Sequence, residues 1–358
     1  MNLFNKCLLL ISAAILAVAM MMTSCRNDDS LTDTIFGDDS ADILDPNSYT
    51  YKLDSFLRVE FLIPYNVRFI YKMEDKGTDM NYNLVPATYE KSKEMAVLTK
   101  YLWFEAYDKI AGVNFLKKTC PRIIHLIGSP AYNPATGTEL LGLAEGGLKV
   151  SLFKVNELDV NNVEAMSELF FKTMHHEFSH ILHQTKAYPK DFNLFSYKDY
   201  NPLGWQDRND SICFSLGFVS PYGGSQTRED WVEVIANYIV KTDKWWDKAY
   251  EVAAKGWIQK DKMQPELGAL DYELIKEVEL NAQGDTVWNA DGTPKMVEKK
   301  RPLPDTDGVD GAAMLRAKLA MCKEWLLVEW GVDLEALRAE VQYRQDHINL
   351  DSLLRQLK

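Results

Sequence analysis

The segment His176-Glu177-Phe178-Ser179-His180 constrains this chain more than any other stretch of its 358 residues. In an α-helix, residues four positions apart lie on the same face, so both histidine rings can reach one metal ion. Glu177 lies one step around the helix and can contact a water molecule that the metal holds. We therefore interpret His176 and His180 as ligands of a tetrahedral Zn²⁺, and Glu177 as the general base of metal-assisted hydrolysis.

The residues before this motif predict a helix that is packed on a core. Apolar side chains recur there every four residues, which is the spacing of one helical face: Met166, Phe170, Met174 and Phe178. Asn161 or Asn162 can cap the start of this helix. The alternative is a core helix that carries histidines by chance, because short motifs have false positives.

A catalytic zinc of this type takes three protein ligands and leaves one position for water. The metzincin spacing would place a third histidine at position 186, where this chain has Lys186. A glutamate from a second helix is the remaining common solution, and segment 227–239 offers Glu229 and Glu233 on one face. One carboxylate can bind zinc while the other accepts the free N–H of a zinc-bound histidine. The alternative is an acidic first turn that the helix dipole favours.

These two motifs resemble the gluzincin peptidases, in which a Glu-Asp-Phe-Ala-Glu segment follows HExxH. This chain has Trp231 and Val232 where phenylalanine and alanine are usual, and both positions stay apolar. The resemblance implies that Glu229 binds zinc, that Glu233 orients a histidine, and that Tyr222, seven residues before Glu229, stabilises the charge on the attacked carbonyl. The residues alone leave the two glutamates interchangeable, and a tyrosine beside proline and glycine is also a common turn or packing residue.

The other histidines near the motif fit the proposed metal less well. His175 lies about 100° around the helix from His176 and cannot easily share its metal. His183 follows His180 by three residues and can approach the site. We interpret both as solvated residues or as residues that support the ligands. His125 lies in an apolar run and is interpreted as a strand histidine.

The N-terminus predicts a secreted lipoprotein. The apolar run 7–22 is short for a membrane span, which needs about 20 residues, so residues 1–24 are expected to be a signal peptide. Met22-Thr-Ser-Cys25 resembles a bacterial lipobox, which implies cleavage before Cys25 and lipidation of that cysteine. An uncleaved anchor is the alternative.

Residues 25–48 hold seven aspartates and one arginine, which predicts a disordered tether. An acidic patch after the lipidated cysteine resembles the signal that sends Bacteroidetes lipoproteins to the cell surface. We therefore expect an outer-membrane lipoprotein exposed at the cell surface, with the periplasmic face as the alternative.

The charge and the cysteines exclude some other functions. A formal net charge of −12 makes nucleic acid a poor partner. Cys120, Cys213 and Cys322 are separated too widely for a thiolate zinc site. Their odd number argues against a disulfide framework, although it allows one bridge.

The rest of the sequence predicts an α+β protein with a zincin-like, gluzincin fold. Strands are expected at 67–73, 122–128 and 146–153, with the last at the sheet edge where gluzincins bind a peptide as an added strand. Helices are expected at 91–111, 228–241, 243–259, 268–279, 311–330 and 334–345. Turn sequences predict a hairpin insertion at 281–309. The catalytic domain is then 49–358, with an upper subdomain at 49–185 that holds a small mixed sheet and the HExxH helix, and a mainly helical lower subdomain at 186–358.

Taken together, these features resemble the Bacteroidetes family of substrate import-associated zinc metallohydrolase lipoproteins. The resemblance covers most of the mature chain, but only the two zinc motifs are specific. It implies a zinc peptidase with a peptide or protein substrate, and a TonB-dependent transporter and its substrate-capturing lipoprotein as partners. The alternatives are a non-catalytic binding lipoprotein and a zinc hydrolase of non-peptide amides. Glu177 argues against the binding protein, because a structural zinc site needs no general base.

Overall fold

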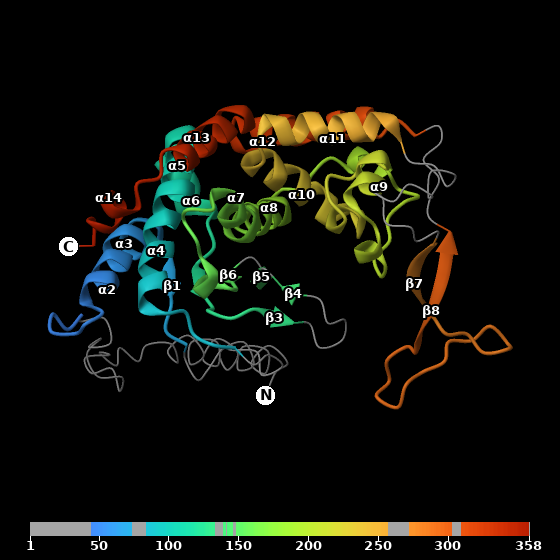
Figure 1. Cartoon of the computed structure of the whole chain (residues 1–358), viewed down its shortest axis with the longest axis horizontal. Coiled ribbons are helices and arrows are strands. Elements are labelled where there is room, and N and C mark those ends of the chain that lie inside the picture. The colour runs from blue at the N-terminus through green and yellow to red at the C-terminus, as the bar shows by residue number, and fades with distance from the viewer. Residues whose placement is uncertain are drawn as a thin grey trace, which may run out of the picture. The chain divides into compact units, whose positions relative to one another are not determined.

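A small mixed sheet supports the helix that carries the HEFSH motif (Figure 1). The computed structural model describes residues 44–73, 84–132, 139–140, 142–145, 148–256, 272–302 and 309–357. Within these residues the sheet has the order β1-β2-β6-β5, and its strands are β1 (Arg68–Ile70), β2 (Ile123–Leu126), β6 (Lys149–Leu152) and β5 (Gly142–Glu145). β1, β2 and β6 run parallel, whereas β5 pairs antiparallel with β6.

The position of β6 corrects one expectation from the sequence. The strand expected at 146–153 is present as β6, but it lies between β2 and β5 and is not the edge. The edge strand is β5, which pairs with β6 from Gly142 opposite Leu152 to Glu145 opposite Lys149. A short hairpin partner could not be recognised from the sequence, because its stability comes from pairing with β6 and not from its own composition.

A long helical segment between β1 and β2 confirms the helix predicted at 91–111. It consists of α4 (Tyr89–Thr99), the π-helical turn η3 (Lys100–Phe104) and α5 (Glu105–Ala111). The segment ends at Gly112, whose φ of +81° suits a residue without a side chain. A second segment carries the HEFSH motif and consists of α7 (Val163–Met166), the π-helical turn η5 (Ser167–Phe171) and α8 (Lys172–Thr185). Its cap is Asn162, whose side-chain oxygen accepts the N–H of Ala165 at 3.0 Å.

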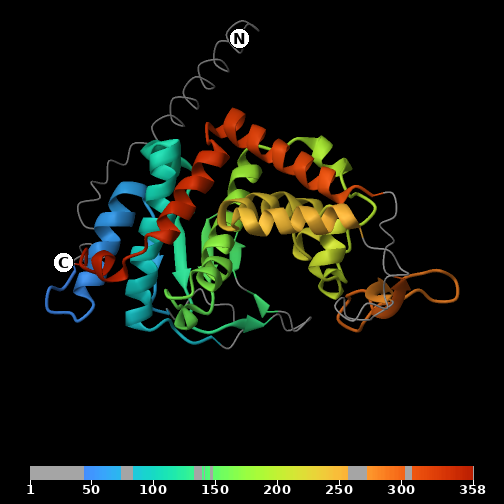
Figure 2. The ribbon, with the colours of Figure 1, turned by 45° about the horizontal axis from the view of Figure 1, so that its top comes forward.

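Helices make up most of the chain after α8. The predicted helices 228–241, 243–259, 311–330 and 334–345 correspond to α10 (Thr227–Val240), α11 (Asp243–Lys255), α12 (Gly311–Trp330) and α13 (Leu334–Asp346). α8 packs on β5 and β6 and also on α10, which in turn packs on α12 and α13. α11 and α12 lie side by side in both views (Figures 1 and 2). α8 and α10 are therefore held between the sheet and the C-terminal helices.

The helix predicted at 268–279 is wrong. Tyr272–Val278 is strand β7, which pairs antiparallel with β8 (Met296–Pro302). The local sequence of this segment gives only a weak signal for helix or strand, and the ladder with β8 decides its conformation. Cross-strand ion pairs such as Lys299 to Glu277 at 2.5 Å add to this pairing. The hairpin predicted within 281–309 thus begins nine residues earlier, at Tyr272; residues 268–271 and 303–308 lie outside the described residues.

Shorter elements complete the described chain. The remaining helices are α2 (Tyr51–Leu57), η2 (Arg58–Leu62), α3 (Ile63–Tyr65), α6 (Val113–Thr119), η4 (Val155–Glu157), η6 (Lys190–Leu194), η7 (Trp205–Asp207), α9 (Asp210–Ser215), η8 (Tyr222–Gly224) and α14 (Leu350–Leu354). The remaining strands are β3 (Ala131–Tyr132) and β4 (Glu139–Leu140), which pair with each other.

One hydrophobic core joins the sheet to the helices. Leu126, Phe178, Trp231 and Leu326 all belong to it. Phe178 in α8 is fully buried and packs edge-on against Trp103, with ring centroids 5.3 Å apart. The apolar face predicted for this helix is confirmed, because Met166, Phe170, Met174 and Phe178 are all buried.

The described residues leave several sequence features aside. The predicted signal peptide 1–24, Cys25 and most of the acidic tether lie outside them. Among the helices that are described, none combines the length and hydrophobicity that crossing a membrane requires. Cys120, Cys213 and Cys322 are buried and form no disulfide with one another, so the one bridge that the sequence allowed is not formed among them.

Candidate metal centre

Two neighbouring helices supply the side chains of the site. α8 carries His176, Glu177 and His180, and α10 carries Glu229 and Glu233. The two helices pack against each other, which places the histidines of α8 opposite the glutamates of α10. Four of these five side chains are buried, and His180 is partly buried. Buried carboxylates and imidazoles are stable only if they form hydrogen bonds or ion pairs with each other or bind an ion.

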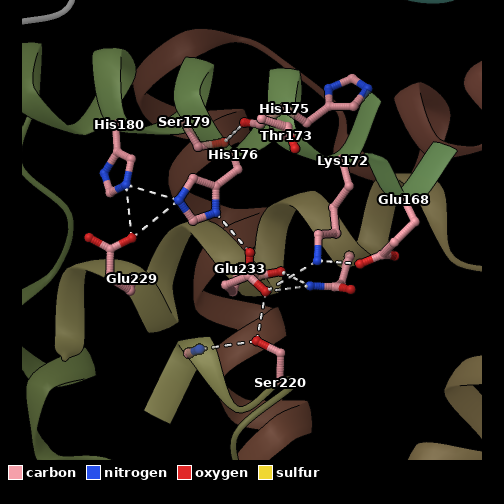
Figure 3. A network of polar contacts seen from close by, with 12 residues as sticks. Glu168, Lys172, Thr173, His175, His176, Ser179, His180, Ser220, Glu229 and Glu233 are labelled. Atoms are coloured by element: carbon pink, nitrogen blue, oxygen red, sulfur yellow. Dashed lines mark hydrogen bonds and ion pairs between the residues drawn. The ribbon is translucent and has the colours of Figure 1, made fainter. Parts of the chain in front are cut away.

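Three donor atoms converge on one point. Nε2 of His176 and Nε2 of His180 are 3.2 Å apart, and Oε2 of Glu229 lies 3.2 Å from the first and 3.1 Å from the second (Figure 3). A tetrahedral Zn²⁺ with bonds of about 2.1 Å separates its ligand atoms by about 3.4 Å, so the triangle is close to the size of one tetrahedral face. These three residues form a group that could hold a metal ion.

The electrostatics of the triangle also fit a cation. Two neutral imidazole nitrogens this close would face each other with their lone pairs, which is unfavourable unless a proton or a metal lies between them. Burial alone would lower the pKa of His176, but Glu229 and Glu233 raise it to about 10 in the metal-free protein. A proton therefore occupies the site in the absence of metal, and metal binding has to release it.

Glu233 contacts the back of His176 and does not face the triangle. Its Oε1 accepts a hydrogen bond from Nδ1 of His176 at 2.8 Å, which leaves Nε2 of that ring as the free donor atom. Its Oε2 accepts hydrogen bonds from Oγ of Ser220 at 2.6 Å and from Nδ2 of Asn237 at 3.1 Å. Burial opposes ionisation, but Lys172, at 3.8 Å, and these donors hold the pKa of Glu233 well below its usual range.

His183 has the corresponding position behind His180. Nδ1 of His180 lies 3.0 Å from Nε2 of His183. Since Nε2 of His180 faces the triangle, its Nδ1 carries the proton and donates it to His183. Burial and the neighbouring His180 lower the pKa of His183 to about 4, so His183 is a neutral acceptor. Of the two roles that the sequence left open for His183, support of a ligand is the one that the structure displays.

His175 contradicts both roles expected for it. It is fully buried on the other side of α8, where Nδ1 lies 3.1 Å from the hydroxyl of Tyr107. Burial lowers the pKa of His175 to about 3, which keeps the ring neutral. His175 is thus a core residue that neither contacts solvent nor supports the metal ligands. His125 lies in β2 and is buried, in agreement with its interpretation as a strand histidine.

Glu177 and Tyr222 lie beside the triangle. Burial, opposed by the two histidines, raises the pKa of Glu177 above its usual value. Tyr222 lies in η8, with its ring centroid 5.8 Å from that of His176 and 5.0 Å from that of Trp205. Tyr222 is 38% exposed, and its partial burial together with the carboxylates of Glu229 and Glu177 raises the pKa of the phenol above its usual value, so it is a hydrogen-bond donor.

A buried ion pair fixes the start of α10. Nζ of Lys318 in α12 lies 2.6 Å from Oδ2 of Asp230, and neither side chain is exposed. Lys318 also donates to the carbonyl of Gly217 at 2.6 Å, and the Tyr200 hydroxyl donates to Asp230 at 2.7 Å. Because Asp230 follows Glu229 directly, this network holds the turn of α10 that presents Glu229 to the histidines.

Sequence reasoning missed three residues that contact Glu233, which are Lys172, Ser220 and Asn237. Asn237 lies one turn after Glu233, and Lys172 one turn before His176, so helical spacing could have found both. Ser220 belongs to a loop and has no such signal. Its contact with Glu233 depends on the tertiary path of the loop before α10, which sequence spacing does not indicate.

Comparisons with known proteins agree with this centre. Nothing among curated proteins matches the sequence. A solved structure titled as a "putative zinc-binding metallo-peptidase" from Bacteroides caccae ATCC 43185 is similar at 34% identity and a TM-score of 0.61, covering 84% of this chain and 95% of that one. Residues 47–335 match the family described as "Putative zinc-binding metallo-peptidase". The chain belongs to this zinc-binding metallopeptidase family.

Proposed function

We propose that this protein is a zinc metallopeptidase of the gluzincin type with a zincin-like fold, and that His176, His180 and Glu229 bind its catalytic ion. The observation that carries this proposal is the convergence of three donor atoms from two helices, with a buried carboxylate, Glu177, next to two of them. Two imidazoles and one carboxylate are the donor set of catalytic zinc sites that keep a position open for water.

The chain's own residues can supply the remaining chemistry. When bound, zinc lowers the pKa of a water molecule and polarises the carbonyl of the substrate. Glu177 accepts the proton of the attacking water and later delivers it to the leaving amine. Tyr222 donates a hydrogen bond to the carbonyl oxygen as negative charge develops there. Glu233 and His183 keep the ring nitrogens of His176 and His180 directed at the ion.

Glu177→Gln tests the reaction separately from metal binding. We expect this variant to keep its zinc, because Glu177 is not one of the three donors, and to lose turnover of a broad peptide library by at least about 100-fold. Zinc content is measured on the same samples as the appearance of new peptide termini. Undiminished cleavage by Glu177→Gln would remove Glu177 from the mechanism, and a zinc-loaded wild type that cleaves no peptide would refute the peptidase proposal.

We further propose that the chain is lipidated on Cys25 and works at the outer membrane, exposed at the cell surface, beside a TonB-dependent transporter and its substrate-capturing lipoprotein. The lipobox-like Met22-Thr-Ser-Cys25 and the acidic segment after it support this location. Metabolic labelling with a fatty acid should mark the wild type and not Cys25→Ala. Digestion of intact cells by an external protease separates surface exposure from the periplasmic face.

A further inference from the structure

Ser220 makes two hydrogen bonds whose directions are fixed by chemistry. Its Oγ lies 2.6 Å from Oε2 of Glu233 and 3.0 Å from the backbone nitrogen of Gly223 (Figure 3). An ionised carboxylate can only accept, and a backbone N–H can only donate. The Ser220 hydroxyl therefore accepts from Gly223 and gives its single proton to Glu233, so both contacts form at once.

The hydrogen bond from Ser220 to Glu233 affects the orientation of His176, a proposed metal ligand. The two oxygens of a carboxylate move together, so a partner that holds Oε2 also sets the direction in which Oε1 meets Nδ1 of His176. Asn237 holds the same oxygen, but it lies one turn further along α10 and also bonds the Glu233 carbonyl at 2.9 Å. Lys172 lies further away, at 3.8 Å. Ser220 is thus the close partner of Glu233 that comes from the loop.

The hydrogen bond from Gly223 to Ser220 affects the position of Tyr222, which precedes Gly223 in the chain. Gly223 lies inside η8, the turn Tyr222–Gly224, and its N–H is held by the side chain three residues earlier, as at the start of a helix. The turn rests on α10, since a Cβ added to Gly223 would lie 3.6 Å from Cα of Asp230. The hydroxyl of Ser220 therefore joins the turn that carries Tyr222 to the carboxylate behind His176.

We propose that Ser220 is a positioning residue that sets, through one hydroxyl, both the orientation of Glu233 behind His176 and the placement of the Tyr222 turn. To cap the turn, the Ser220 side chain would need only to accept a hydrogen bond. Its hydroxyl also donates one, to Glu233 in α10, thirteen residues later in the chain. The part that concerns Tyr222 rests on the proposed function, and the part that concerns the metal requires only that zinc binds.

Ser220→Ala, Ser220→Thr and a matched control, Ser215→Ala, test the proposal without a substrate. Ser215 is a buried serine whose hydroxyl donates to the carbonyl of Ser211 at 2.7 Å, away from the metal centre. Zinc affinity is measured by competition with a chelator. We expect roughly tenfold weaker zinc binding for Ser220→Ala, the size of an effect exerted through a ligand's partner. Ser220→Thr keeps the hydroxyl and should restore affinity, and Ser215→Ala should match the wild type.

Hydrogen exchange in zinc-free protein tests the contact with the turn. Loss of the acceptor should speed exchange in the segment 221–225 by roughly fivefold in Ser220→Ala, the effect of one hydrogen bond, but not in Ser220→Thr or Ser215→Ala. Ser220→Gly removes the same hydroxyl and replaces Ser220→Ala if that variant does not fold. Thermal melting confirms that each protein compared is folded.

The outcomes separate this proposal from the proposed function. If the wild type binds zinc and Ser220→Ala binds it equally well with unchanged exchange, the positioning proposal is overturned while the function stands. If the wild type binds no zinc, both the function and the metal part of the proposal fail. With a cleavable peptide in hand, Ser220→Ala should lower kcat more than it raises KM, and this loss should shrink in a Tyr222→Phe background.

Discussion

Glu229 and Glu233 are both glutamates on one face of α10, yet the structure assigns them different environments that isosteric variants can tell apart. Oε2 of Glu229 lies 3.1 Å and 3.2 Å from the two imidazole nitrogens of the triangle. Glu233 instead accepts hydrogen bonds from His176, Ser220 and Asn237. Glu229→Gln should therefore act mainly on metal binding, and Glu233→Gln mainly on the stability of the metal-free fold.

The expected magnitudes follow from what each carboxylate contacts. Structural zinc sites with four ligands bind with about 10–16 kcal/mol, or roughly 3 kcal/mol per ligand, so loss of Glu229 should weaken zinc binding by about 10²–10³-fold. Replacing the partner of a ligand costs about 10–100-fold, which applies to Glu233. In the metal-free protein, Glu233→Gln leaves several buried donors without their anion and should cost roughly 2–4 kcal/mol of unfolding free energy. Glu229→Gln should cost less, about 1–2 kcal/mol, because the amide oxygen can still accept from the histidines and the Glu229 side chain is more exposed than that of Glu233, 11% against 3%.

Zinc affinity by chelator competition and unfolding by urea in a chelator measure both quantities on the same two proteins. The assignment predicts that the larger loss of affinity and the larger loss of stability fall on different variants. If Glu233→Gln shows the greater loss of zinc and Glu229→Gln the greater loss of stability, the two glutamates have the opposite roles. If both variants bind zinc like the wild type, α10 supplies no ligand and the proposed centre is wrong.

Three further predictions concern the support of the site. Burial opposes ionisation of Glu168, but ion pairs with Lys172 and Lys241 lower its pKa. The ionised carboxylate therefore stabilises the fold fully above the unfolded pKa of Glu168, and this stabilisation is lost as the pH falls through the lowered folded pKa. In urea titrations, the stability difference between wild type and Glu168→Gln should be present at pH 7 and vanish in acid. Lys318→Met should cost about 3–5 kcal/mol by leaving a buried Asp230 unpaired, and adding Asp230→Asn should recover part of that unfolding free energy. Phe178→Ala should cost about 3–5 kcal/mol by opening a cavity behind the metal face of α8, and calorimetry measures that loss.

Local sequence was enough wherever an element is defined by its own periodicity or by a short motif. The four-residue repeat from Met166 to Phe178 predicts a helix with one buried face, and HEFSH predicts two ring nitrogens on the other. α12 begins at Gly311 and ends at Trp330, as the apolar pattern and the following glycine predict. These features depend on residues within one or two turns of each other, so the sequence contains the whole interaction.

Interactions between distant segments could be decided only by the tertiary structure. The segment that forms β7 is predicted to be helical from the local sequence, but its strand conformation depends on the ladder with β8, from Val278 opposite Met296 to Tyr272 opposite Pro302. The sequence alone left Glu229 and Glu233 equivalent, since both have the same spacing and residue type. Their environments differ because α10 packs on α8 in one register, which brings Oε2 of Glu229 to the Nε2 atoms and Glu233 to Nδ1 of His176.

The sequence by itself therefore determined that one helix carries an HExxH motif and that a second helix carries two glutamates on one face. The tertiary structure decided which carboxylate faces the histidines, buried His175 in the core, and brought Ser220 from a loop to Glu233. The physical reason is that a side chain's partner within one helix follows from spacing, whereas its partner on another element follows from how the shared core packs.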